Sequence, residues 1–65
     1  MSKRRLYEVR TRLAPEDGEW WGQARAIVDD DIEDIAEVWA ESYAEAHEQL
    51  ATEVSFWLES FEAGR

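Results

Sequence analysis

Apolar and polar side chains alternate in two stretches near the start of the chain, residues 6–13 and 20–28. A period of two is typical of β-strands that bury one face. Residues 14–19, between these stretches, have the sequence Ala-Pro-Glu-Asp-Gly-Glu, which favours a turn. The pattern therefore predicts a β-hairpin over residues 6–28.

One register of this hairpin suits both of its faces. Apolar residues then oppose one another on one side, and the other side gains an ion pair and a cation–π contact. The predicted pairs are Leu13–Trp20, Val9–Ala24 and Tyr7–Ala26 on the apolar face, and Glu8–Arg25 and Arg12–Trp21 on the polar face. The small residues of the second strand leave a shallow apolar surface on which a helix can lie.

The apolar period then becomes helical. At about 100° per residue, one stripe collects Ile32, Ile35, Trp39, Tyr43, Ala46, Leu50, Val54, Trp57 and Phe61. The acids of residues 29–31 suit a helix N-terminus, and neither Pro nor Gly follows before Gly64. We predict one amphipathic helix over residues 29–62. A break near residues 47–52, which would give a helical hairpin, is the alternative.

These elements make a single domain of residues 1–65 with an α+β fold, in which a β-hairpin precedes one long helix. A helix of about 30 residues spans roughly 45 Å, whereas eight-residue strands span about 27 Å. The hairpin would therefore leave the apolar stripe from Leu50 to Phe61 uncovered. A second copy of the chain covers it most simply, and a bound target is the alternative. We expect a homodimer, with Trp39 and Trp57 in the core or the dimer seam.

Charge is unevenly distributed along the chain. The net charge is −9, and residues 26–64 hold twelve of the sixteen acids but no Lys or Arg. Such a segment either keeps a small protein soluble or attracts a basic partner. The acidity argues against direct binding to nucleic acid or to an anionic membrane. The short basic run of residues 3–5 either contacts phosphate or folds back on the acidic helix.

The chemistry-bearing residues fit no enzyme template. The chain has no Cys and a single His, His47, so neither a disulfide nor a thiolate metal site is available. His47 and Glu48 begin like a zinc-protease helix motif, but Ala51 occupies the position of the second histidine. The acids of residues 29–34 lack the glycine of a calcium loop. We expect a non-enzyme without cofactor or metal, with His47 at the edge of the apolar stripe. No apolar run is long enough for a membrane span or a signal peptide, so we expect a cytoplasmic protein.

Several side chains are candidates for binding a basic protein. Glu33, Glu37, Glu41 and Glu45 recur about every 6 Å along one side of the predicted helix and are candidates for imitating phosphates. This stripe is sparser than duplex DNA, which carries a charge per roughly 1.7 Å, and a dimer with two such stripes would narrow the difference. Apolar side chains beside these acids are typical of binding hot spots, although they could instead pack in a dimer or cover an arginine stem. The predicted partner-binding residues are Glu33, Asp34, Glu37, Val38, Glu41, Glu45, Glu48, Phe56 and Trp21.

The size, acidity, aromatic content and strand–strand–helix order of residues 6–61 resemble the small acidic inhibitors that phages direct against host DNA-handling enzymes. Uracil-DNA glycosylase inhibitors belong to this group. The resemblance implies a DNA mimic, active in the cytoplasm of a bacterial host, that occupies the basic groove of the enzyme and offers a pocket to a protruding enzyme side chain. It rests on no shared motif, so no functional residue is transferred. An antitoxin, an anti-CRISPR or anti-restriction protein, and a structural homodimer with a solvated acidic face remain alternatives.

Overall fold

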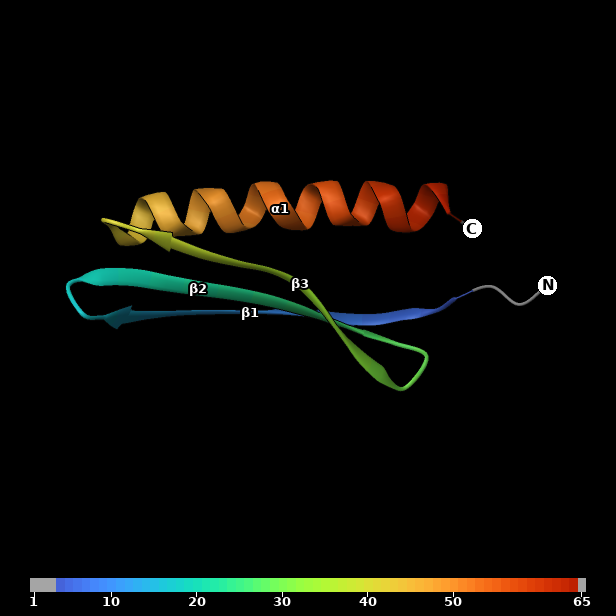
Figure 1. The fold of residues 1–65 in the computed structure, drawn as a ribbon. Helices are drawn as coiled ribbons and strands as arrows, with labels where there is room; N and C mark the ends of the chain where they lie inside the picture. Colours follow the sequence, from blue (N-terminus) through green and yellow to red (C-terminus); the bar gives the residue numbers. More distant parts are fainter. Residues whose placement is uncertain (1–3, 65) are drawn as a thin grey trace.

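Three strands precede one helix in the computed structural model, which describes residues 4–64 (Figure 1). Strands β1 (Leu6–Glu16), β2 (Glu19–Val28) and β3 (Asp31–Ala40) form an antiparallel sheet in that order. Helix α1 (Tyr43–Ala63) lies along one face of the sheet. The α+β class predicted from the sequence is confirmed, and the sheet contains one strand more than the predicted hairpin.

Both strand connections are two-residue turns with a left-handed backbone. Asp17 and Gly18 have φ values of 51° and 80°, and Asp29 and Asp30 have φ values of 50° and 71°. Positive φ at both central residues is the geometry that matches the twist of antiparallel strands, and Asp tolerates it. The predicted helix start at residue 29 is therefore wrong. Asp29 also holds Arg5, because its Oδ1 accepts the Arg5 N–H at 2.9 Å.

The segment 31–40 pairs with β2 as a strand, so the predicted helix over residues 29–62 is too long. A β-bulge lies between Asp34 and Ala36, which pair with Arg25 and Ala24, and it leaves Ile35 without a partner. Before the bulge the odd-numbered residues face the helix, and after it the even-numbered residues do. The apolar residues of β3 are therefore spaced in the sequence as they would be on a helix.

Helix α1 begins after Ser42, whose side-chain oxygen accepts the N–H of Glu45 at 3.2 Å. This contact supplies a partner for one of the free amides of the first turn. The helix then continues without a break to Ala63, which excludes the alternative of a helical hairpin. Its 21 residues span about 32 Å, close to the length of the strands.

The predicted register of the β1–β2 hairpin is wrong by two residues. Leu13 lies opposite Gly22 instead of Trp20, and Val9 lies opposite Ala26. An even offset keeps the side chains of residues 8–13 on their predicted faces, because side chains alternate with a period of two. The predicted Glu8–Arg25 pair is wrong, since Arg25 lies opposite Arg10. The cation–π contact is confirmed, since the Arg12 guanidinium lies 5.8 Å from the centre of the Trp21 ring.

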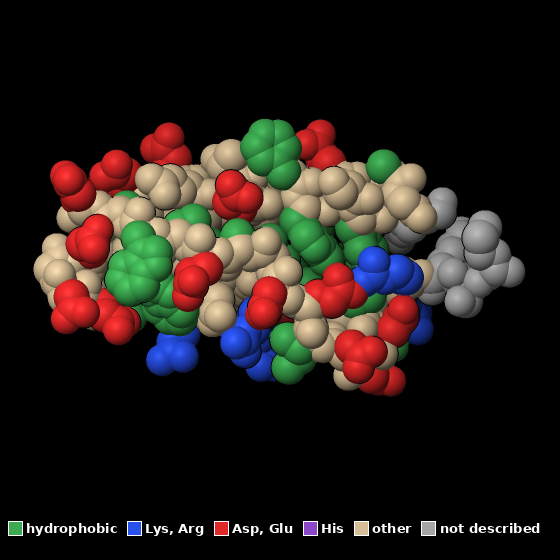
Figure 2. Space-filling model, in the orientation of Figure 1, with side chains coloured by type: hydrophobic (Ala, Val, Ile, Leu, Met, Phe, Trp, Pro, Cys, Tyr) green, Lys and Arg blue, Asp and Glu red, His purple; other side chains and the backbone are tan. Residues whose placement is uncertain are grey.

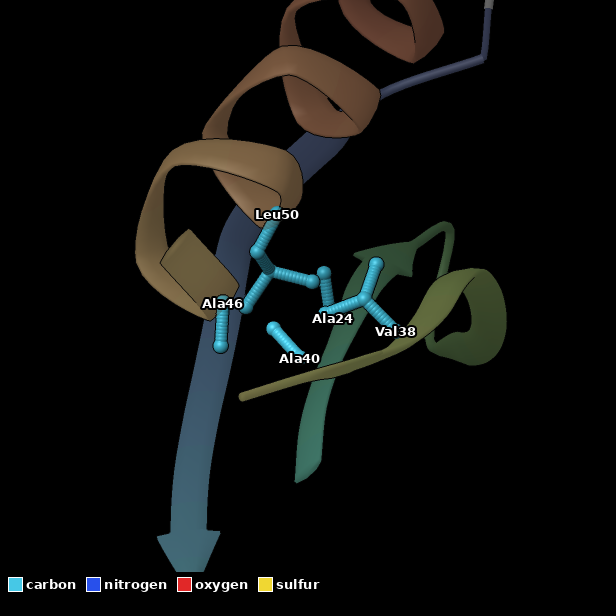
Figure 3. Close-up of a cluster of buried hydrophobic side chains, with 5 residues drawn as sticks. All are labelled: Ala24, Val38, Ala40, Ala46 and Leu50. Carbon is cyan, nitrogen blue, oxygen red and sulfur yellow. The ribbon is translucent and has the colours of Figure 1, made fainter. Parts of the chain in front are cut away.

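Small side chains on the sheet let the helix approach closely. Ala46 and Leu50 of α1 point towards Ala24, Val38 and Ala40, and all five are buried (Figure 3). A second cluster joins Phe61 of the helix to Ala26 and Val28 of β2. The predicted exposure of the stripe from Leu50 to Phe61 is thus wrong at both ends, because Leu50 and Phe61 are buried within the chain itself.

Candidate protein-binding surface

The nine predicted partner-binding residues come from three elements instead of one helix. Trp21 belongs to β2, and Glu41 lies in the connection before α1. Strand β3 contributes Glu33, Asp34, Glu37 and Val38, and helix α1 contributes Glu45, Glu48 and Phe56. The predicted helical spacing of about 6 Å between the acids is therefore wrong, since half of them lie on a strand.

Three of the β3 acids have partners within the chain. Glu33 forms an ion pair with Arg4, and Asp34 Oδ1 lies 3.1 Å from Arg25 Nε. The carboxylate of Glu37 accepts the indole N–H of Trp21 at 2.6 Å. The Arg4 contact confirms, for one of its residues, that the basic run folds back on the acidic segment; Lys3 lies outside the described residues.

The acids nearer the helix are available to a partner. Glu41, Glu45 and Glu48 are exposed, and their carboxylates form no ion pair within residues 4–64. Their charge is therefore not neutralised by the chain.

The apolar candidates divide into one core residue and two surface residues. Val38 is only 9% exposed and packs in the core, so it is not one of the apolar side chains that stand exposed beside the acids. Phe56 is 62% exposed and lies roughly 80–120° around the α1 axis from Leu50 and Ala46. Trp21 is half-buried on the sheet face that α1 does not cover, between Arg12 and Glu37.

Among the described residues, the bases are confined to one part of the molecule, whereas acids occur on every strand and on the helix. Within residues 4–64, every cation lies before or on β1 or on β2, whereas β3, its connection to α1 and α1 itself contain none. Figure 2 shows acidic side chains over the helix and the strand in front of it, with basic side chains along the lower edge and towards the N-terminal end. Acids separated from bases in this way produce a negative potential over one side of the molecule.

Three arginines gather on the uncovered face of the sheet. Arg10 lies opposite Arg25, and both line a shallow depression of about 310 Å³ with Arg12, Gln23 and Thr11. Like charges directly opposite each other destabilise a sheet. Here Glu8 and Asp34 offset the repulsion by pairing with Arg10 and Arg25.

Sequence analysis missed two exposed apolar residues on the same face. Trp39 lies opposite Trp21 and is 47% exposed. Of its two predicted places, the core is wrong and the dimer seam stays a prediction. Ile32 is 64% exposed beside Ile27. The exposure of Trp39 follows from treating residues 31–40 as a strand, because Trp39 and Glu37 then alternate with the buried Ala40 and Val38. The exposure of Ile32 depends in addition on the bulge at Ile35, which reverses the alternation before it.

An apolar groove runs between β1 and α1. It has a volume of about 390 Å³ and is lined by Thr11, Leu13, His47, Leu50, Ala51, Val54, Ser55 and Leu58. The groove exists because α1 packs mainly over β2 and β3 and leaves the helix-facing side of β1 partly open. His47 stands at its rim and stacks on Tyr43, with ring centres 6.0 Å apart.

The polar groups of residues 4–64 do not assemble into a metal site. No three His, Asp or Glu side chains in this part of the chain are grouped to hold an ion. The hydroxyls that form hydrogen bonds serve the helix, since Ser42 caps it and Thr52 donates to the carbonyl of Glu48 at 3.0 Å. Within the same residues, no helix is both long and apolar enough to cross a bilayer.

Comparisons with known proteins leave the function to be argued from these residues. The chain matches no protein-family model, no curated protein and no solved structure.

Proposed function

We propose that this protein is a non-enzymatic inhibitor that binds the basic nucleic-acid groove of a host enzyme, most concretely a uracil-DNA glycosylase. The observation that carries the proposal is the separation of charge. Strand β3, the connection to α1 and α1 present ten acids and no base. A basic groove that evolved to hold phosphates would attract this side of the molecule.

Two rows of acids stand in for the phosphates. Four acids within the ten residues of β3 give about one charge per 8 Å, whereas one DNA strand carries a charge every 3.4 Å. The acids of α1 run beside those of β3 and partly make up the difference in charge density between the protein and DNA. The protein thus resembles DNA in the negative charge along this surface, without the regular spacing of phosphates.

Phe56 is the apolar anchor of this surface. On a helix, positions three and four residues apart are neighbours, so Phe56 lies beside Glu53 and Glu59 as well as Thr52 and Ser60. A large exposed side chain surrounded by polar residues is the usual composition of a binding hot spot.

The test is inhibition of purified uracil-DNA glycosylase, followed at increasing salt. We expect inhibition that weakens with salt, because exposed charge pairs are screened. The double variant Glu53→Lys/Glu59→Lys should weaken inhibition at least about tenfold, since it reverses the charges beside the anchor. Glu16→Lys/Glu19→Lys is the matched control, with the same change of net charge at the β1–β2 turn.

Two results would contradict the proposal. The first is that neither this enzyme nor other DNA-binding enzymes, such as restriction nucleases and CRISPR effectors, are inhibited. The second is that the two double variants lose inhibition equally, because net charge alone would then explain the effect.

An antitoxin is the second candidate, and the arginine cluster on the uncovered sheet face favours it. Antitoxins often bind operator DNA in addition to their toxin, and Arg10, Arg12 and Arg25 are positioned together for phosphate contacts. Specific retardation of a DNA fragment, lost in Arg12→Ala and Arg25→Ala variants, would favour this candidate over the inhibitor.

A further inference from the structure

Strand β1 has an unused edge. It pairs with β2 on one side, and no segment of residues 4–64 pairs with its other side. The strand is 11 residues long, so it presents a row of free N–H and C=O groups that is ready to pair with another chain. The apolar groove opens along the same edge.

The chain alone is less compact than most domains of its size. Its radius of gyration is 13.2 Å, whereas about 10.7 Å is typical for 65 residues. Its accessible surface is 4927 Å², against about 4,300 Å² for a compact monomer of 7.6 kDa. Most of the buried apolar residues within 4–64 are Ala or Val. Further burial in an assembly would make up for this small core.

The charges of the two edge strands determine which of them can pair with the same strand of a second copy. The other edge strand, β3, contains four acids and no base, so two β3 edges would repel each other. In β1, Glu8 alternates with Arg10 and Arg12 on the uncovered face. An acid and a base two residues apart can complement each other when two such strands run antiparallel.

We propose that two copies of this chain pair through their β1 edges, antiparallel about a two-fold axis at Val9. In this register Glu8 of each copy lies opposite Arg10 of the other, which creates two ion pairs. Moving the axis to Thr11 would instead oppose Arg10 to Arg12. The charge pattern of the strand therefore selects the register.

The same register brings an exposed aromatic residue to the groove. Tyr7 is 57% exposed, at the irregularity between Leu6 and Glu8. With the axis at Val9, Tyr7 of one copy lies opposite Thr11 of the other, which lines the groove. The ring of Tyr7 is the side chain that would fill the open space beside Leu58.

The resulting assembly is a six-stranded sheet with β3 at both outer edges. It places β1, whose two acids are balanced by two arginines, at the centre and the acidic sides outwards, which limits repulsion between the copies. An ordinary stable interface takes about 800 Å² from each partner, roughly a sixth of the surface of this chain. The dimer is argued independently of the proposed function and leaves Phe56 free in both copies.

The test uses two charge variants, separately and mixed. Glu8→Arg and Arg10→Glu should each weaken the dimer at least about tenfold in sedimentation equilibrium, because each turns two attractive pairs into two repulsive ones. In an equal mixture the two variants become complementary and should form a heterodimer, detected by native mass spectrometry. Glu19→Arg, which reverses a charge at the far end of β2, is the control and should dimerise like the wild type.

A second measurement addresses the groove and guards against variants that misfold. Tyr7→Ala should weaken the dimer, whereas Phe56→Ala should weaken enzyme inhibition alone. In the wild type, amide exchange of β1 should slow as the protein concentration rises. A wild-type protein that stays monomeric at millimolar concentration would overturn the inference. So would folded charge variants that, when mixed, show no preference for the heterodimer.

Discussion

Gly22 lies where the neighbouring strands and the helix leave no room for a side chain. It lies on β2 between Leu13 and Val38, under Leu50 of the helix. A Cβ added there would stand 2.9 Å from a methyl carbon of Leu13 and 2.9 Å from one of Val38. The Val38 side chain is stiff at χ1 and has little room to yield. The absence of a side chain at Gly22 thus lets the helix lie against the sheet.

We expect Gly22→Ala to lower the free energy of unfolding by about 1–2 kcal/mol, since overpacking outweighs the gain from a less flexible unfolded chain. Urea denaturation measures the change. A Val38→Ala background removes one of the two close contacts of the Cβ, so Gly22→Ala should there cost less than in the wild type. Equal costs in both backgrounds would show that the Val38 contact is not the cause.

At the scale of elements, the sequence predicted the fold class, the first hairpin and the second half of the helix. Those parts have an uninterrupted period, and the faces of β1 and β2 follow from it. Strand β3 was missed for a physical reason. Its bulge at Ile35 interrupts the alternation, so Ile32, Ile35 and Trp39 are spaced as on a helix. The Ser42 cap, with Glu45 three residues later, is the sequence feature that marks the true helix start.

The N-cap predicts a measurable loss of stability. Ser42→Ala removes the oxygen that accepts the Glu45 N–H, and it should lower the free energy of unfolding by about 1 kcal/mol. Ser42→Asp keeps an acceptor and adds a charge that suits the helix dipole, so it should retain most of the stability. Ser60→Ala, at an exposed helical position, is the control. Equal losses in Ser42→Ala and Ser60→Ala would argue against the cap.

The sequence predicted most of the residues of the candidate surface, but not how these residues are arranged in space. Phe56 and all the predicted acids except the half-buried Glu33 are exposed, because charge and a position off the apolar stripe suffice to place them outside. Val38, predicted to be exposed, is buried, and Trp39, predicted in the core or the dimer seam, is exposed. The exposure of both depends on the bulge in β3. The partners of Glu33 and Asp34 required three-dimensional proximity, which no spacing within one segment reveals.

The charge of the whole molecule predicts how its stability depends on salt. The thinnest dimensions of the chain are 20 Å and 12 Å, below the screening length of about 30 Å at 0.01 M salt. Acids on opposite sides therefore repel one another in dilute buffer. We expect the free energy of unfolding to rise by about 1 kcal/mol between roughly 0.01 M and 0.5 M sodium chloride. Urea denaturation at a fixed protein concentration measures it.

Neutralising two acids at the helix C-terminus separates this repulsion from a general salt effect. Glu59 and Glu62 lie near the negative end of the α1 dipole, and no base occupies the last turn. Glu59→Gln/Glu62→Gln should therefore raise stability in dilute buffer and reduce the gain from salt. The slope of unfolding against urea should stay constant, because the surface exposed on unfolding does not change. If salt stabilised this variant as much as the wild type, the effect would come from apolar burial and not from the acidic side of the molecule.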